Sequence, residues 1–155
     1  MKRYCTIYRK DTGEIVHYSN FTCEDEIEYI SRNFFVRLSM FGVHDHDYVE
    51  FESDPDRHYV AVLDGQGVIA DRPEMVVFVE DDKFTIQAGG EDSATLTGLP
   101  DPCEIIVDDP DPSVETQTFT VEGGGFVFSA DDSGVYTVEV RRWPFLPLKI
   151  EFTAI

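Results

Sequence analysis

Short stretches in which apolar and polar residues alternate, separated by turn-forming residues, run along most of the chain. Alternation at period two indicates half-buried strands, and short connections rich in glycine and aspartate between two such stretches predict hairpins. The turns at residues 10–13 and 64–67 have this character. In the N-terminal part the pattern predicts strands at residues 4–9, 14–18, 48–52, 57–63, 67–70 and 75–79.

One segment of the N-terminal part has the period of a helix instead. Apolar residues recur there at spacings of three and four, which places them on one face of a helix of about four turns. Thr22 is a suitable N-cap and Gly42 a suitable stop. We expect a core helix packed on a sheet, and the alternative is a helix that binds a partner. The residues of the stripe are Ile27, Ile30, Phe34, Leu38 and Phe41.

From Lys83 onward the chain consists of short predicted strands with turn signals about every 8–12 residues, the pattern of a β-sandwich. The acidic run at residues 80–82 indicates a boundary. We therefore predict a mainly β fold with one helix (α+β), with an N-terminal α+β module at residues 1–80 and an antiparallel β-sandwich at 81–155. The sandwich strands are predicted at 83–88, 93–97, 103–107, 116–121, 126–129, 135–140 and 148–153.

The sequence Asp132-Ser133-Gly134-Val135-Tyr136 resembles the D-x-G/A-x-Y motif that opens strand F of immunoglobulin-like (Ig-like) sandwiches. In that family the tyrosine hydroxyl bonds to the backbone upstream and fixes the corner between two strands. The resemblance implies structural roles for Asp132, Gly134 and Tyr136. Antibody domains have a cysteine two residues after this tyrosine, where this chain has Val138, so its core is expected to hold by packing alone.

Charge narrows the range of partners. The 155 residues include 12 basic and 31 acidic ones, for a net charge of −19. Nucleic acids and anionic membrane surfaces both require positive charge, so neither is an expected partner. The acidity is either a solvated surface or a surface that docks onto a basic protein. Twelve acidic residues and no basic one lie between Lys83 and Arg141.

The N-terminus lacks an apolar signal segment, and no apolar run approaches the roughly 20 residues of a membrane-spanning helix. The three cysteines, Cys5, Cys23 and Cys103, lack C-x-x-C spacing and allow at most one intrachain disulfide. This usage suits a protein made in a reducing cytoplasm.

Candidate chemistry is weak throughout. His44 and His46, with nearby aspartates and His58, are the residue types of a zinc site, but spacing fixes no third ligand. The aspartates at 108–111 suit a solvated turn better than a calcium loop. Cys23 at a helix start is better explained as a partly buried thiol than as a reactive one. No nucleophile elbow, phosphate loop or dinucleotide fingerprint occurs. We therefore predict no catalytic, cofactor-binding or metal-binding residues.

Several stretches follow one another in a distinctive order and spacing. They are Asp11-Thr12-Gly13-Glu14-Ile15-Val16, His58-Tyr59-Val60 with Gly67 and Arg72-Pro73, residues 94–103, and Gly134-Val135-Tyr136-Thr137-Val138 followed by Trp143-Pro144-Phe145-Leu146. Taken together, these stretches resemble a group of small proteins encoded among the tail and fibre genes of tailed bacteriophages and prophages. The resemblance spans most of the chain, although the amphipathic segment at 27–41 is longer than that group's pattern. It implies a virion or virion-assembly protein without catalysis.

We therefore expect a structural component of a phage virion, in the tail, baseplate, fibre attachment or decoration, which is made in the host cytoplasm and acts by protein–protein binding. Its expected partners are other phage structural proteins, a homo-oligomer or symmetric ring, or a host surface glycan. The alternatives are a tail-fibre assembly chaperone that leaves the particle and a metal-dependent hydrolase at the histidines.

The expected partner-binding residues are Trp143, Phe145 and Leu146 with Arg141 and Arg142 before them. Aromatic anchors beside arginine have the composition of binding hot spots, and the two prolines of this segment limit the entropy lost on docking. The alternative is that the three apolar side chains fold inward and plug the end of the sandwich.

Overall fold

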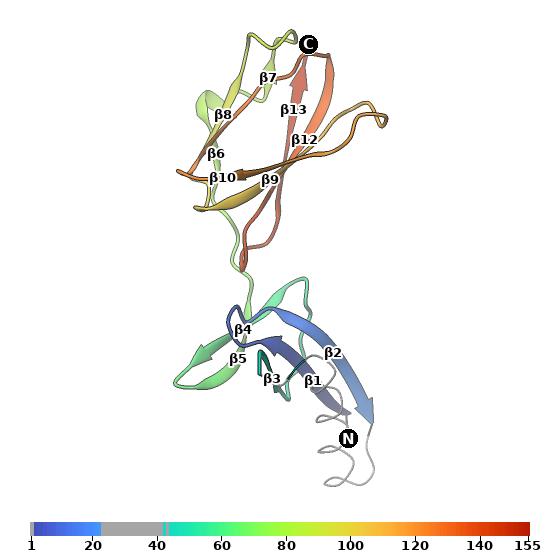
Figure 1. The fold of residues 1–155 in the computed structure, drawn as a ribbon, viewed down its shortest axis with the longest axis vertical. Coiled ribbons are helices and arrows are strands. Elements are labelled where there is room, and N and C mark those ends of the chain that lie inside the picture. The colour runs from blue at the N-terminus through green and yellow to red at the C-terminus, as the bar shows by residue number, and fades with distance from the viewer. Residues whose placement is uncertain (1, 23–41, 43) are drawn as a thin grey trace. The chain divides into compact units, whose positions relative to one another are not determined.

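The computed structural model describes residues 2–22, 42 and 44–155, and these residues form mainly β-structure in several antiparallel sheets (Figure 1). The mainly β class predicted from the alternating pattern is thus confirmed. The chain divides into two compact units, Met1–Arg72 and Pro73–Ile155. The predicted helix at 27–41 lies outside the described residues.

The first unit contains a three-stranded antiparallel sheet in the order β2-β1-β3 and a separate hairpin, β4-β5. Its small core consists of Tyr8, Ile15 and Val60, with Val49 and Ile69 packed against them. The strands are β1 (Lys2–Arg9), β2 (Ile15–Thr22), β3 (His46–Val49), β4 (His58–Leu63) and β5 (Gln66–Asp71).

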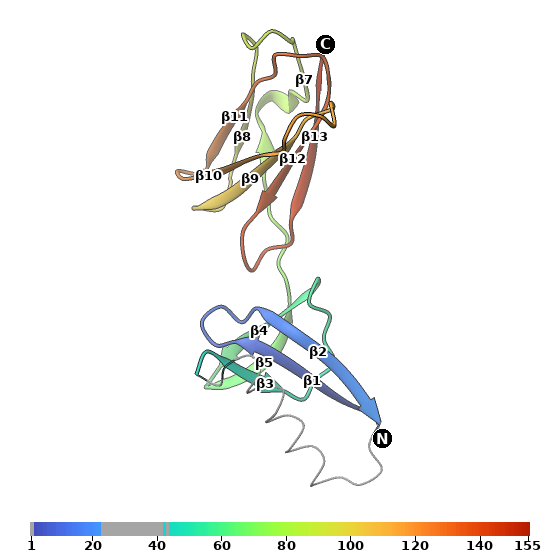
Figure 2. The same cartoon turned by 45° about the vertical axis from the view of Figure 1, so that its right-hand side comes forward.

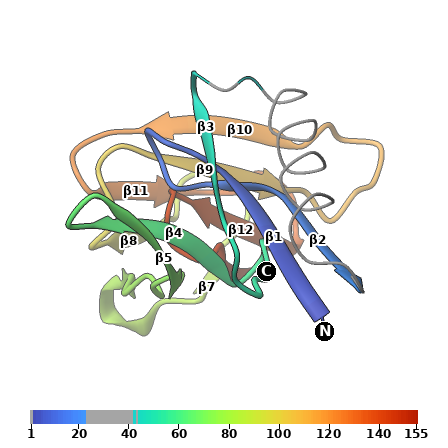
Figure 3. The ribbon, with the colours of Figure 1, turned by 90° about the horizontal axis from the view of Figure 1, so that it is seen from below.

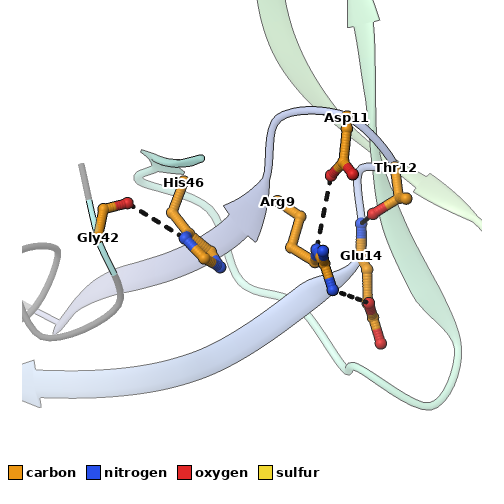
Figure 4. Close-up of polar contacts among 6 residues, drawn as sticks. All are labelled: Arg9, Asp11, Thr12, Glu14, Gly42 and His46. Atoms are coloured by element: carbon orange, nitrogen blue, oxygen red, sulfur yellow. Dashed lines mark hydrogen bonds and ion pairs between the residues drawn. The ribbon is translucent and has the colours of Figure 1, made fainter. Parts of the chain in front are cut away.

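Side-chain contacts stabilise the turn between β1 and β2 (Figure 4). The Arg9 Nε atom lies 3.5 Å from Asp11 Oδ1, and its Nη1 atom lies 3.9 Å from Glu14 Oε2. The Glu14 amide donates a hydrogen bond to the Thr12 hydroxyl. Gly13 has a positive φ of 73°, and its carbonyl accepts a hydrogen bond from the Val60 amide at 2.9 Å. The turn therefore joins the sheet to the β4-β5 hairpin at one backbone contact.

The second unit is a sandwich of two sheets. One has the order β10-β9-β12-β13-β7 and the other β11-β8-β6 (Figures 1 and 2). All pairs are antiparallel except β7 with β13, which is parallel. The strands are β6 (Phe78–Val79), β7 (Thr85–Ile86), β8 (Ala94–Thr97), β9 (Cys103–Asp108), β10 (Gln117–Val121), β11 (Gly125–Phe128), β12 (Gly134–Arg141) and β13 (Leu148–Ala154).

The chain changes sheets at the start of this unit. β6 pairs with β8 in the smaller sheet, and β7 pairs with β13 in the larger one. Between them lies a single 3-10 turn, Glu80–Asp82, in which Asp81 and Asp82 have φ values of 55° and 50°. Met75 is buried in the core of the sandwich. Residues 73–80 therefore belong with the second unit, and the acidic run that indicated a boundary forms this turn.

Aromatic rings fill the middle of the sandwich. Phe152 is fully buried and stacks on Phe128 at a centroid distance of 5.0 Å and on Phe84 at 6.1 Å. Phe128 also meets Tyr136 edge to face at 5.4 Å. Val138 of β12 is likewise fully buried. An apolar side chain packed in the core therefore stands at the position where antibody domains have a cysteine.

Tyr136 joins the core to the turn before β12. Its ring is buried, and its hydroxyl donates a hydrogen bond to the backbone carbonyl of Asp132 at 3.0 Å. Burial raises the pKa of this hydroxyl. Gly134 is required in the same turn because a Cβ atom there would stand 2.4 Å from the Pro110 ring. Asp132, Gly134 and Tyr136 thus act together at one corner.

Replacing Tyr136 by phenylalanine removes only the hydroxyl. We expect the free energy of unfolding to fall by about 1–3 kcal/mol, because the Asp132 carbonyl then loses its partner. Denaturant unfolding followed by tryptophan emission measures this change. A loss under roughly 0.3 kcal/mol would show that the hydrogen bond adds nothing to the corner.

Candidate partner-binding site

The segment between β12 and β13 carries the only tryptophan of the chain. It begins with a cis peptide bond between Trp143 and Pro144. The Leu146 amide donates to the carbonyl of Pro73 at 2.8 Å, and Phe145 packs against the core of the sandwich. The prolines make this segment a turn between strands rather than a continuation of the ladder.

Trp143 lies beside a shallow surface hollow of about 360 Å³ at the ends of β9, β10 and β12. Arg141 and Arg142 line the same hollow, so the structure brings three of the five predicted partner-binding residues together there. Phe145 and Leu146 do not line it, and Leu146 lines a smaller depression with Met75. The remaining lining residues of the hollow are Pro102, Cys103, Glu104 and Thr120.

Arg141 is engaged within its own sheet. Its Nε donates to Glu139 Oε1 at 2.6 Å, and the Nζ of Lys149 on β13 lies 3.6 Å from Glu139 Oε2. The Arg141 guanidinium and, to a smaller degree, Lys149 hold the pKa of the buried Glu139 below its ordinary value. Residues two apart on a strand share a face, so alternation alone could have indicated the Arg141–Glu139 pair. The pair therefore engages the Arg141 guanidinium within the sheet.

Two histidines of the candidate metal cluster, His46 and His58, make local contacts. His46 Nδ1 lies 3.2 Å from the Gly42 carbonyl (Figure 4), and His58 Nδ1 accepts the Asp54 amide at 2.8 Å. His58 Nε2 also lies 3.3 Å from Asp71. Among residues 2–22, 42 and 44–155, no group of three His, Cys, Asp or Glu side chains is placed to hold a metal ion.

The aspartates at 108–111 organise the loop between β9 and β10. Asp108 accepts a hydrogen bond from the Thr116 hydroxyl at 2.8 Å, Asp109 accepts one from the Asp111 amide, and Asp111 accepts one from the Ser113 amide.

Two of the three cysteines lie among the described residues. Cys5 and Cys103 are both buried, and burial raises the pKa of the Cys103 thiol. Cys23 lies outside the described residues.

The comparisons with known proteins assign no family. No family model matches the chain, and no curated protein matches it. A solved structure with some likeness is a glycosyl hydrolase family 2 member from Bacteroides cellulosilyticus, with a TM-score of 0.36 and 13% sequence identity. The likeness covers 98% of this chain but only 21% of that one.

In the described part of the chain, no helix is long and apolar enough to cross a membrane.

Proposed function

We propose that the protein is a structural component of a tailed bacteriophage particle and acts by binding neighbouring proteins. The order and spacing of the sequence motifs that resemble phage tail and fibre proteins support this role. The structural observation that supports the proposal most is that Trp143 and Arg142 line the same surface hollow. Tryptophan and arginine are the residues in which interface energy concentrates.

The strand order supports an Ig-like second unit. In that interpretation β8, β9, β12 and β13 correspond to strands B, C, F and G, β10 lies beside C, and β11 corresponds to E. The first strand is split between the two sheets as β6 and β7. The hydrogen bond from Tyr136 to Asp132 agrees with this correspondence. Such sandwiches are common rigid modules for presenting end loops, and the segment at 142–147 is an end loop of this kind.

Replacing Trp143 and Arg142 together by alanine tests the docking role. Phe145, which packs on the core, is left intact, so we expect a stable variant that incorporates into particles at least about 30-fold less than the parent. Incorporation is measured by quantitative mass spectrometry of purified, salt-washed particles. A matched control is Phe78→Ala, an aromatic residue of the same unit that is 62% exposed and does not line the hollow.

Each competing function gives a different result. An assembly chaperone would be absent from salt-washed particles that contain every tail protein. A metal-dependent hydrolase at His44 and His46 would retain a stoichiometric metal ion after purification. Normal incorporation of the folded double variant would reject the docking role of Trp143 and Arg142.

A further inference from the structure

Two strand edges lie side by side along one margin of the second unit. β10 ends the five-stranded sheet and β11 ends the three-stranded sheet (Figure 3). Within the described residues, β10 pairs only with β9 and β11 only with β8. The ring of Phe119 on β10 lies 5.8 Å from that of Phe126 on β11. Each strand therefore has one side of its backbone without a strand partner.

The β10 edge has none of the usual protection against pairing. Exposed edges are normally blunted by charged side chains, proline, bulges or very short strands. The opposite edges of the two sheets, β6 and β7, follow this rule with two residues each. β10 is five residues long, Gln-Thr-Phe-Thr-Val, with neither charge nor proline, and its first four residues are exposed. An edge of this kind can accept an added strand.

A groove of about 290 Å³ runs between these two edges. Its floor includes the Phe119–Phe126 pair, with Val114 and Val127 beside it. Val127 is 61% exposed. Because successive side chains of a strand point to opposite faces, every second residue of an added strand would place its side chain in this groove. The other lining residues are Val107, Asp109, Glu115, Gln117, Phe128, Ser129, Ala130, Asp131, Asp132 and Tyr136.

Charge indicates what this groove would accept. Four carboxylates line it and no basic residue does. The ion pairs of Lys83, Arg141 and Lys149 are made with Asp92 and Glu139, neither of which lines the groove. A second copy of the chain would bring the same four carboxylates to the contact, and like charges repel. A basic strand would instead meet opposite charge beside the start of β10 and the end of β11, where these carboxylates lie.

We propose that β10 and the adjoining groove form a strand-addition site for an extended, basic segment of a partner protein, with lysine or arginine alternating with apolar residues. The segment pairs its backbone with β10 and inserts its apolar side chains over Phe119 and Phe126. Its basic side chains start on the opposite face of the added strand, and their long stems reach around its edge to the acidic rim. This rim consists of Asp109, Glu115, Asp131 and Asp132. This site deepens the proposed binding function and rests on it. It is separate from the hollow at Trp143, because no residue lines both the groove and the hollow.

The test uses the full chain and synthetic peptides of about six residues, an ordinary strand length. One peptide alternates lysine with valine, and two further peptides have the same sequence with N-methyl groups on alternate residues, one along each edge of the strand. N-methylation preserves charge and removes the donors of a strand edge. We expect the first peptide to bind and to slow amide exchange in β10. The peptide that is N-methylated along the edge facing β10 should bind at least about tenfold more weakly, and the one methylated along the other edge should bind like the first.

A set of neutral variants tests the acidic rim. Asp109→Asn, Glu115→Gln and Asp131→Asn together should weaken binding of the lysine peptide by about tenfold. The matched control, Asp81→Asn with Glu91→Gln and Glu151→Gln, removes the same charge from exposed positions outside the groove and should change binding less than about twofold.

The outcomes separate the possibilities. Binding that persists with both N-methylated peptides, or without protection of β10, indicates non-specific adsorption and overturns the proposal. Protection of β10 that rises with protein concentration in the absence of peptide indicates self-association and also overturns it. Failure of the parent chain to bind the lysine peptide does the same. None of these results alters the particle-incorporation test of Trp143 and Arg142, so the two proposals fail separately.

Discussion

Replacing Phe152 by alanine is expected to lower the free energy of unfolding of the second unit by about 3–5 kcal/mol, the range for deleting a buried phenylalanine. Phe152 is fully buried on β13 and stacks on rings from the segment before β7 and from β11. Its removal leaves a cavity that borders both sheets, because β11 and β13 belong to different sheets. Rigid flanking strands limit how far such a cavity can collapse.

Emission from Trp143 measures this loss in denaturant titrations, because the single tryptophan lies in the same unit. The matched control is Phe78→Ala, which also truncates a phenylalanine of this unit but at a position that is 62% exposed. That variant should lose less than about 1 kcal/mol. Equal losses in the two variants would contradict the central position of Phe152 in the core.

The second large effect is expected in the first unit, at Gly13. A Cβ atom at this position would stand 2.0 Å from the Val60 carbonyl oxygen, and the backbone there has a φ of 73°. Gly13→Ala therefore combines a strained backbone with a backbone clash. We expect a loss of about 2–4 kcal/mol. Amide exchange at Val60 is the measurement, because its amide donates to the Gly13 carbonyl.

Gly65 provides the matched control. It has nearly the same φ, 77°, but a Cβ atom there meets nothing within 4 Å. Gly65→Ala should therefore cost only the backbone strain, about 1 kcal/mol. The difference between the two variants isolates the contact with Val60. If Gly13→Ala were no worse than Gly65→Ala, the close approach of the turn to β4 would be refuted.

The strands of the sandwich could be predicted from the sequence because alternation and turn residues are local signals. For example, β9 is one residue longer than predicted at one end, and β12 is one residue longer at each end. The pairing of β7 with β13 could not be predicted, since a two-residue strand has no periodicity and its partner lies far along the chain. The same holds for the approach of Gly13 to Val60, which depends on how two hairpins pack.

The candidate sites could be predicted only in part, for a similar reason. Composition alone indicated Trp143, Arg141 and Arg142, but only the fold shows that Arg141 is paired with Glu139 while Phe145 packs against the core. The groove beside β10 had one local signal, an uncharged strand within a long acidic stretch. That signal has meaning only once β10 is known to be an edge, and strand order is a property of the whole sheet.

The parallel contact between β7 and β13 has a mechanical consequence. In the second unit, which begins at Pro73, β7 lies near the N-terminal end and β13 at the C-terminal end. Three backbone hydrogen bonds join these segments, from the amides of Thr153, Ile155 and Ala88 to the carbonyls of Phe84, Ile86 and Ile155, respectively. Tension between the two ends of the unit pulls the parallel strands in opposite directions along their length. The hydrogen bonds between the two strands are then loaded together in shear rather than broken one after another. This arrangement makes the unit resist extension under force.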